Sequence, residues 1–234
     1  MYMNNPGENP SENPVKAFVD EFVQAIEEDH KDPKTRFSGD LKLGCPSTRA
    51  IGVFVSAVMQ NPELVNDFLN EVKEVLELNS TENNKTNLSV QLVPSVTFER
   101  MAVGLVDKYF SSTNAEKIDI EGFKGGFRAV AENDMRASDP TYREGDLVIP
   151  GRGATDFLIG TIRHYPNGVE SLFDAVDEIL KVYFKTTSDY YSGKARFYEN
   201  FIRTLVKDLA ASGVVGQGRG RFKSLAFGVL DDKI

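Results

Sequence analysis

"KARFYENFIRTLVKDLAASGVVGQGRGRFKSLAF", residues 194–227, is the stretch that most constrains the fold of this chain. With about 100° of rotation per residue, its first part, residues 194–211, predicts an amphipathic helix. One side collects an apolar stripe that we expect to be buried: Tyr198, Phe201, Ile202, Leu205 and Leu209. A second side collects a mainly basic stripe: Arg196, Asn200, Arg203 and Lys207.

The residues after this helix predict a glycine-rich hairpin. Gly213 is a natural left-handed cap that ends the helix. Val214–Val215 and the segment 222–229 can then pair as two short strands around the turn at Gly216–Gly220. Arg219, Arg221 and Lys223 fall in or next to that turn. We expect these cations and the basic stripe of the helix to form one open patch.

The residue types in this patch suit double-stranded DNA. Arginine reads guanine edges, asparagine reads adenine, and lysine or arginine contacts phosphates. The order of a helix, a small residue with glycine, two β-branched residues, a Gly/Arg-rich turn and a strand resembles the winged-helix family over residues 169–229. That resemblance implies that Arg196, Asn200, Arg203 and Lys207 face the DNA groove. It also implies that Arg219, Arg221 and Lys223 are wing contacts. The segment "TTSDYYSGK" before the helix departs from the family pattern, because it contains no separate second helix.

The rest of the chain predicts a mainly α fold with short β-hairpins. Residues 1–13 are Asn-, Pro- and Glu-rich and are expected to be a disordered tail. Apolar spacing predicts a helical unit over 14–78, including a helix that starts at Asn61-Pro62. Residues 79–90 are a polar linker, and residues 91–234 form a helical region that ends in the winged-helix-like module. A sequence echo between 109–127 and 183–201 indicates either a second copy of the module within 99–153 or chance similarity.

Composition limits the class of protein. The 234 residues include one cysteine, no tryptophan and 41% hydrophobic residues, which is typical of a globular protein of a reducing compartment. Neither a membrane span nor a secretory signal is evident, so a cytoplasmic location is expected. The net charge is −8, which argues against a general nucleic-acid binder. However, residues 181–223 hold nine Lys/Arg against three Asp/Glu, a local charge of +6 that leaves −14 elsewhere.

The sequence contains few candidates for catalysis. The two histidines, His30 and His164, belong to no metal-spaced cluster, and Cys45 has no histidine near it in sequence. No phosphate-binding glycine loop or nucleophile elbow occurs. Two alternatives involve carboxylates: a cation site from Asp174, Asp177 and Glu178, which is more simply a solvated acidic face, and a nuclease built from Asp139, Glu144, Asp146 and a lysine, which no spacing demands. We therefore expect no enzyme activity, no catalytic residues, no metal site and no cofactor.

Two functions follow from these observations. The first is a non-enzymatic DNA-binding protein of the transcription-regulator or replication-initiator type, which uses the basic helix and the wing. The second is a protein–protein adaptor or assembly protein, whose module docks a protein partner or a second copy of the chain. Winged helices also serve as protein–protein modules, and the acidic net charge of the chain fits that use.

Overall fold

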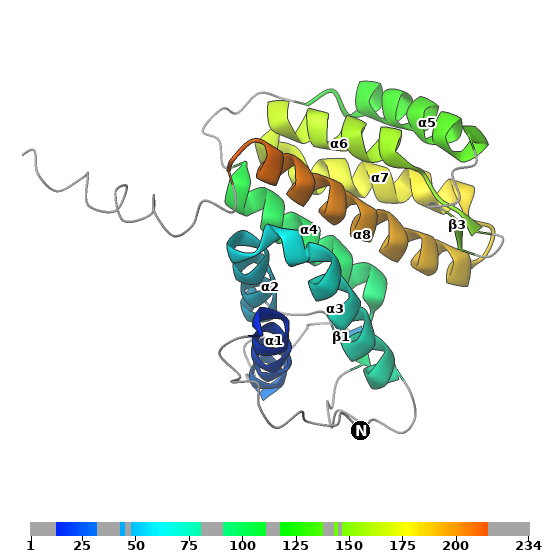
Figure 1. Cartoon of the computed structure of the whole chain (residues 1–234). Helices are drawn as coiled ribbons and strands as arrows, with labels where there is room; N and C mark the ends of the chain where they lie inside the picture. The colour runs from blue at the N-terminus through cyan, green and yellow to red at the C-terminus, as the bar shows by residue number, and fades with distance from the viewer. Residues whose placement is uncertain are drawn as a thin grey trace, which may run out of the picture.

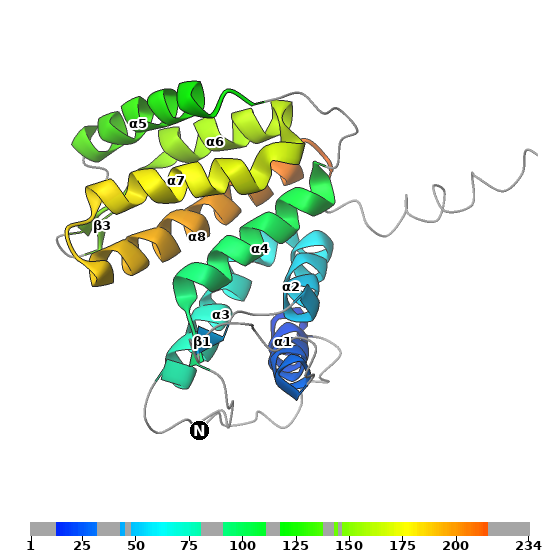
Figure 2. The same ribbon diagram turned by 180° about the vertical axis from the view of Figure 1, so that it is seen from behind.

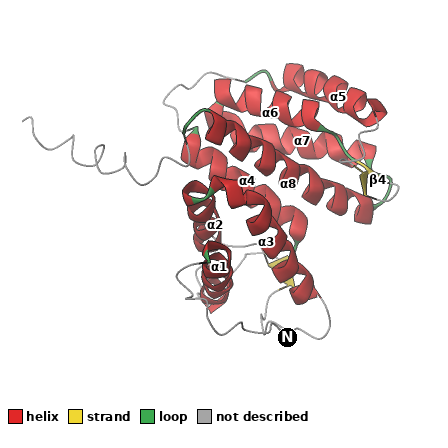
Figure 3. Ribbon diagram, viewed as in Figure 1, coloured by secondary structure: helices red, strands yellow, loops and turns green. Residues whose placement is uncertain are grey.

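Helices dominate the computed structural model, which describes residues 13–31, 43–44, 48–80, 91–110, 118–137, 143–144 and 147–214. Within these ranges lie eight α-helices: α1 (Pro14–Lys31), α2 (Thr48–Gln60), α3 (Val65–Ser80), α4 (Pro94–Tyr109), α5 (Ile120–Ala137), α6 (Arg152–His164), α7 (Val169–Tyr183) and α8 (Thr187–Ala211). Figure 3 shows that strands and loops make up only a small part of the described chain beside the helices. The prediction of a mainly α fold is confirmed. None of the described helices is long and apolar enough to span a bilayer.

The strands are minimal. β1 (Leu43–Gly44) pairs in parallel with β2 (Gln91–Leu92), and β3 (Arg143–Glu144) pairs antiparallel with β4 (Leu147–Val148). Two 3-10 turns, η1 (Pro62–Leu64) and η3 (Pro166–Gly168), lead directly into α3 and α7. The helix predicted to start at Asn61-Pro62 therefore begins as a 3-10 turn. After α8 the described residues include no hairpin, and the predicted wing from residue 215 onward lies outside them.

The helices form two groups that meet at α4. Figures 1 and 2 show α5, α6, α7 and α8 stacked on one side of α4, and α1, α2 and α3 on the other. α4 packs along α8 and also contacts α2. Buried apolar residues of both groups belong to one continuous cluster, from Phe18 of α1 to Leu209 of α8. The first two residues of the predicted linker, 79–90, are the last two of α3, and residues 81–90 lie outside the described ranges.

α8 is longer than the sequence analysis predicts. It begins at Thr187 rather than near Lys194, so most of "TTSDYYSGK" forms its first turns. Thr186 caps this start, because its side-chain oxygen accepts a hydrogen bond of 3.0 Å from the Asp189 amide. Gly193 lets the turn sit on the Phe184 ring, whose Cζ would be 2.2 Å from an added Cβ. The helix ends as predicted, with Gly213 in the left-handed region at φ 71°.

Burial of α8 explains its place at the centre of the fold. All five residues of the predicted apolar stripe are buried, and so are Phe197 and Val206 on neighbouring faces. α3, α4, α6 and α7 all contact α8. A helix with so many neighbours has little surface left for solvent. Some charged side chains of α8 must therefore lie between helices.

Candidate binding groove

Part of the basic stripe of α8, Arg196 and Arg203, is tied through Glu199 and Asn66 to α3 rather than open to solvent. Glu199 sits beneath it, and its side chain is 2% exposed. The carboxylate of Glu199 binds three cations: Lys73 of α3 at 2.7 Å, Arg196 at 3.5 Å, and Arg203. Arg203 also donates to the side-chain oxygen of Asn66 on α3. These contacts tie α8 to α3.

The electrostatics of Glu199 follow from this arrangement. Burial alone raises the pKa of Glu199, but the hydrogen bonds and charges of Lys73 and Arg203 outweigh burial and hold its pKa below the usual 4.5. The carboxylate is therefore ionised at neutral pH and keeps its three cations in place. Removing one partner of such a buried group leaves the others uncompensated.

The expectation of one open basic face is therefore wrong for part of the predicted stripe. The side chains of Arg196 and Arg203 are only 32% and 25% exposed, because α3 and Glu199 occupy their side of α8. Asn200 is also partly buried, and its amide nitrogen has no hydrogen-bond partner. Lys207 is exposed. The predicted wing contacts Arg219, Arg221 and Lys223 lie outside the described residues, and the DNA-binding role itself stays a prediction.

A groove of about 390 Å³ opens beside this ionic cluster, between α3, α4 and α8. Its polar and charged lining is Lys73, Glu77, Ser95, Tyr191, Ser192, Arg196 and Glu199, and its apolar lining is Leu76, Val93, Pro94, Phe98 and Ala195. A groove of this volume can hold a small molecule or a few side chains of a short peptide. Tyr191 stands at the groove with 48% of its surface exposed, its ring 5.2 Å from that of Tyr190.

Two hydrogen-bonding atoms of groove residues have no partner. Ser95 is 1% exposed, and its hydroxyl makes no hydrogen bond; the Nε donor of Arg196 is also buried without a partner. Most buried polar atoms in proteins are hydrogen-bonded, and leaving one without a partner costs about 1–3 kcal/mol. A ligand that supplies an acceptor to these atoms would recover that free energy.

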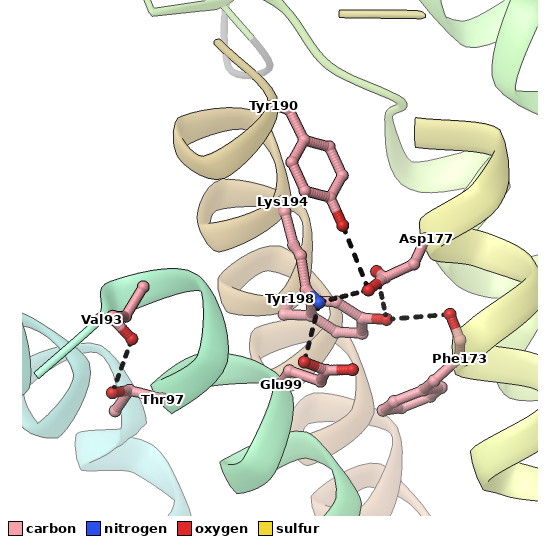
Figure 4. A network of polar contacts seen from close by, with 8 residues as sticks. All are labelled: Val93, Thr97, Glu99, Phe173, Asp177, Tyr190, Lys194 and Tyr198. Carbon is pink, nitrogen blue, oxygen red and sulfur yellow. Dashed lines mark hydrogen bonds and ion pairs between the residues drawn. The ribbon is translucent and has the colours of Figure 1, made fainter. Parts of the chain in front are cut away.

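A second charged cluster joins α4, α7 and α8 (Figure 4). Lys194 of α8 is 7% exposed and binds Asp177 of α7 and Glu99 of α4, the latter at 2.8 Å. The hydroxyls of Tyr190 and Tyr198 each donate to Asp177 at 3.3 Å. Burial lowers the pKa of Lys194, but the two carboxylates outweigh burial and raise it. The lysine is thus held protonated and lacks the lone pair that a nucleophile needs.

In the sequence, Lys194 and Glu199 are recognisable only as charges of residues 181–223, and their burial is not predicted. Lys194 precedes Tyr198 by four residues, so it extends the apolar stripe by one turn. Glu199 lies three residues after Arg196 and four before Arg203, which is the spacing of helical ion pairs. Both signals were present, but neither distinguishes a buried pair from a solvated one.

The described residues bring together no three His, Cys, Asp or Glu side chains that could hold a metal ion. In the alternative cation site, Asp177 binds Lys194 and Glu178 binds Lys124 at 2.6 Å. His164 ends α6 and is exposed. Cys45, Asp139 and Asp146 lie outside the described residues.

Comparisons with protein-family models, with curated proteins and with solved structures found no match to this chain.

Proposed function

We propose that this chain is a non-enzymatic adaptor or assembly protein that binds a segment of a partner protein in the groove between α3, α4 and α8. One observation carries the proposal: the groove combines an apolar lining, a half-exposed tyrosine and hydrogen-bonding atoms without partners. Protein interfaces concentrate their binding energy on such features, with tyrosine and arginine prominent among the residues that matter most.

The charges of α8 support this function over the DNA-binding alternative. A helix that reads bases must present its side chains to the major groove. Arg196 and Arg203 instead share the carboxylate of Glu199. Both side chains are at least two-thirds covered, so neither projects freely from α8 as a base-reading side chain does. The DNA-binding prediction then depends on Lys207 and on Arg219, Arg221 and Lys223.

The test is a selection of short random peptides against the protein, followed by affinity measurements on two variants. Ala195→Trp fills the groove, and Ala129→Trp places the same side chain on an exposed position of α5, away from the groove. We expect the selected peptides to bind Ala195→Trp about tenfold or more weakly than the wild type, and Ala129→Trp equally well.

A parallel gel shift with random duplex DNA at low and moderate salt tests the alternative. Duplex binding that weakens in Arg203→Ala for one preferred sequence, and in Arg219→Ala for all sequences, would support the DNA-binding function and overturn the proposal. The proposal would also be overturned if the selected peptides bound both tryptophan variants with the same affinity as the wild type.

A further inference from the structure

The charge balance of the groove indicates what kind of segment it accepts. Lys73, Arg196 and Arg203 surround Glu199, and Glu77 adds a second carboxylate at the groove. Three cations against two carboxylates leave one positive charge. One carboxylate from a partner would neutralise it, whereas a dianionic phosphate would leave one negative charge in a partly buried site.

Arg196 is the cation with the most unused hydrogen-bonding capacity. Arg196 makes one long ion pair, from its Nη1 to Glu199 at 3.5 Å, and its Nε donor has no partner. Arg203 binds both Glu199 and Asn66, and Lys73 is 2.7 Å from Glu199. A guanidinium binds a carboxylate with two parallel hydrogen bonds when two adjacent donors are available.

Both unpartnered atoms are covered in the structure. The Arg196 side chain is about one-third exposed, so it has room to turn toward the groove. The Ser95 hydroxyl rotates freely about its own bond and lies in the same groove. To bind a carboxylate in the groove, Arg196 would give up only its long contact with Glu199, and Ser95 would give up no hydrogen bond.

The apolar part of the groove adds a second requirement. Phe98 and Leu76 are each 2% exposed and lie in its lining, beside the half-exposed Tyr191. An aliphatic or aromatic side chain placed there would be covered by three helices. Burying such a side chain is the main source of free energy in peptide docking.

We propose that the groove binds an acidic–apolar peptide segment, in which one Asp or Glu carboxylate pairs with Arg196 and Ser95 and a neighbouring apolar side chain contacts Leu76 and Phe98. This inference rests on the proposed function and specifies its partner. The carboxylate replaces the missing partners of Arg196 and Ser95, and the apolar side chain covers Tyr191. Before the partner binds, the uncompensated positive charge near Glu199 disfavours segments whose basic residues would enter the groove.

Three peptide pools test the chemistry of the partner. All contain random Leu, Phe, Ala and Gly; the first adds Asp and Glu, the second replaces these by Asn and Gln, and the third by phosphoserine. We expect the acidic pool to bind the full-length protein about tenfold more tightly than the amide pool. Equal binding of the acidic and amide pools, or tighter binding of the phosphoserine pool, would overturn the carboxylate assignment.

Paired variants locate the contacts. Arg196→Gln is expected to weaken binding of the acidic pool by about tenfold. Arg203→Gln removes one cation of the charge balance but none from the groove lining, so it is expected to weaken binding less, by about threefold. Ser95→Ala removes a hydroxyl without a partner, so it is expected to weaken binding by about fivefold without lowering thermal stability. Thr97→Val is its control, because the Thr97 hydroxyl donates to the carbonyl of Val93, the residue that precedes α4.

The outcomes separate this inference from the proposed function. If all pools bind, and Ala195→Trp abolishes binding while Arg196→Gln and Ser95→Ala do not, the groove is a peptide site but its carboxylate specificity is wrong. If no pool distinguishes the wild type from Ala195→Trp, the proposed function fails as well.

Discussion

Replacing Lys194 by methionine removes the cation that α8 places between Asp177 and Glu99. The side chains of Asp177 and Glu99 are only 14% and 21% exposed, so the variant leaves two poorly hydrated carboxylates facing each other. Removing one partner of a buried ion pair costs about 3–5 kcal/mol. Because Tyr190 and Tyr198 continue to donate to Asp177, we expect a loss near the lower end, about 3 kcal/mol of unfolding free energy at neutral pH.

The pH dependence of this loss follows from Glu99. Burial raises the pKa of Glu99 above its usual 4.5 even with Lys194 present, and removal of Lys194 takes away the two largest effects that oppose the rise, its hydrogen bond and its charge. The folded state of the variant then holds this proton more tightly than the unfolded chain does. Its stability falls as pH rises through the interval between the unfolded and folded pKa values. The loss caused by Lys194→Met is therefore largest at neutral pH and smaller at about pH 5.

Urea unfolding followed by far-ultraviolet circular dichroism at both pH values measures the effect. Lys181→Met is the matched control, because Lys181 is exposed and its ammonium lies 5.6 Å from the centre of the Tyr190 ring; we expect a loss below about 1 kcal/mol. Adding Glu99→Gln to Lys194→Met should restore about 1–2 kcal/mol. Equal losses in the two lysine variants, or a Lys194→Met loss that does not shrink at the lower pH, would refute the buried-pair argument.

Three further predictions concern other positions. Gly125→Ala is expected to stabilise α5 by about 0.5–1 kcal/mol, because an added Cβ meets no atom within 4 Å. Gly126→Ala would place its Cβ 2.7 Å from the Phe157 ring and should cost about 1–3 kcal/mol. Thermal unfolding of the two variants tests both expectations. Burial raises the pKa of Tyr109 to about 12, and its hydroxyl has no partner, so Tyr109→Phe should leave stability unchanged or raise it by up to about 1 kcal/mol in urea titrations. Because cations lower the pKa of Glu199 below 4.5, its stabilisation is present above that pH and is lost as pH falls through the lowered value. The difference in unfolding free energy between wild type and Glu199→Gln should therefore narrow when the urea titrations are extended from about pH 5 to about pH 3, and a constant difference over that range would contradict the assignment.

Much of the fold follows from local sequence signals. The 3.6-residue spacing of apolar residues in 169–183 and 198–209 predicts stripes that are buried in α7 and α8, with Tyr183 only partly covered. Gly213 ends α8 because a residue without Cβ adopts a positive φ easily. The start of α8 was misplaced, because the cap at Thr186 and the packing of Phe184 on Gly193 depend on a tertiary contact that spacing alone does not reveal.

The candidate groove could not be predicted from the sequence. Its lining comes from α3, α4 and α8; α8 is separated from the other two helices by a long stretch of chain and meets them only through helix packing. Helical spacing shows that Arg196, Asn200 and Arg203 share a face, but it does not show whether solvent or another helix covers that face. That face is partly covered because the buried carboxylate of Glu199 binds both arginines and also Lys73 of α3.

The local excess of +6 in residues 181–223 therefore does not translate into one basic surface among the described residues. Lys194, Arg196 and Arg203 are paired with carboxylates, which leaves Lys181, Lys185 and Lys207 exposed. Lys185 precedes the first turn of α8 and Lys207 lies in its last turns, so about 30 Å of helix separates them at 1.5 Å per residue. Because exposed charges farther apart than about 10 Å are largely screened at physiological salt, Lys185 and Lys207 act independently. A role on duplex DNA would have to rest on Arg219, Arg221 and Lys223 gathering near Lys207, whereas the groove has its cations and its unpartnered hydrogen-bonding atoms already in place.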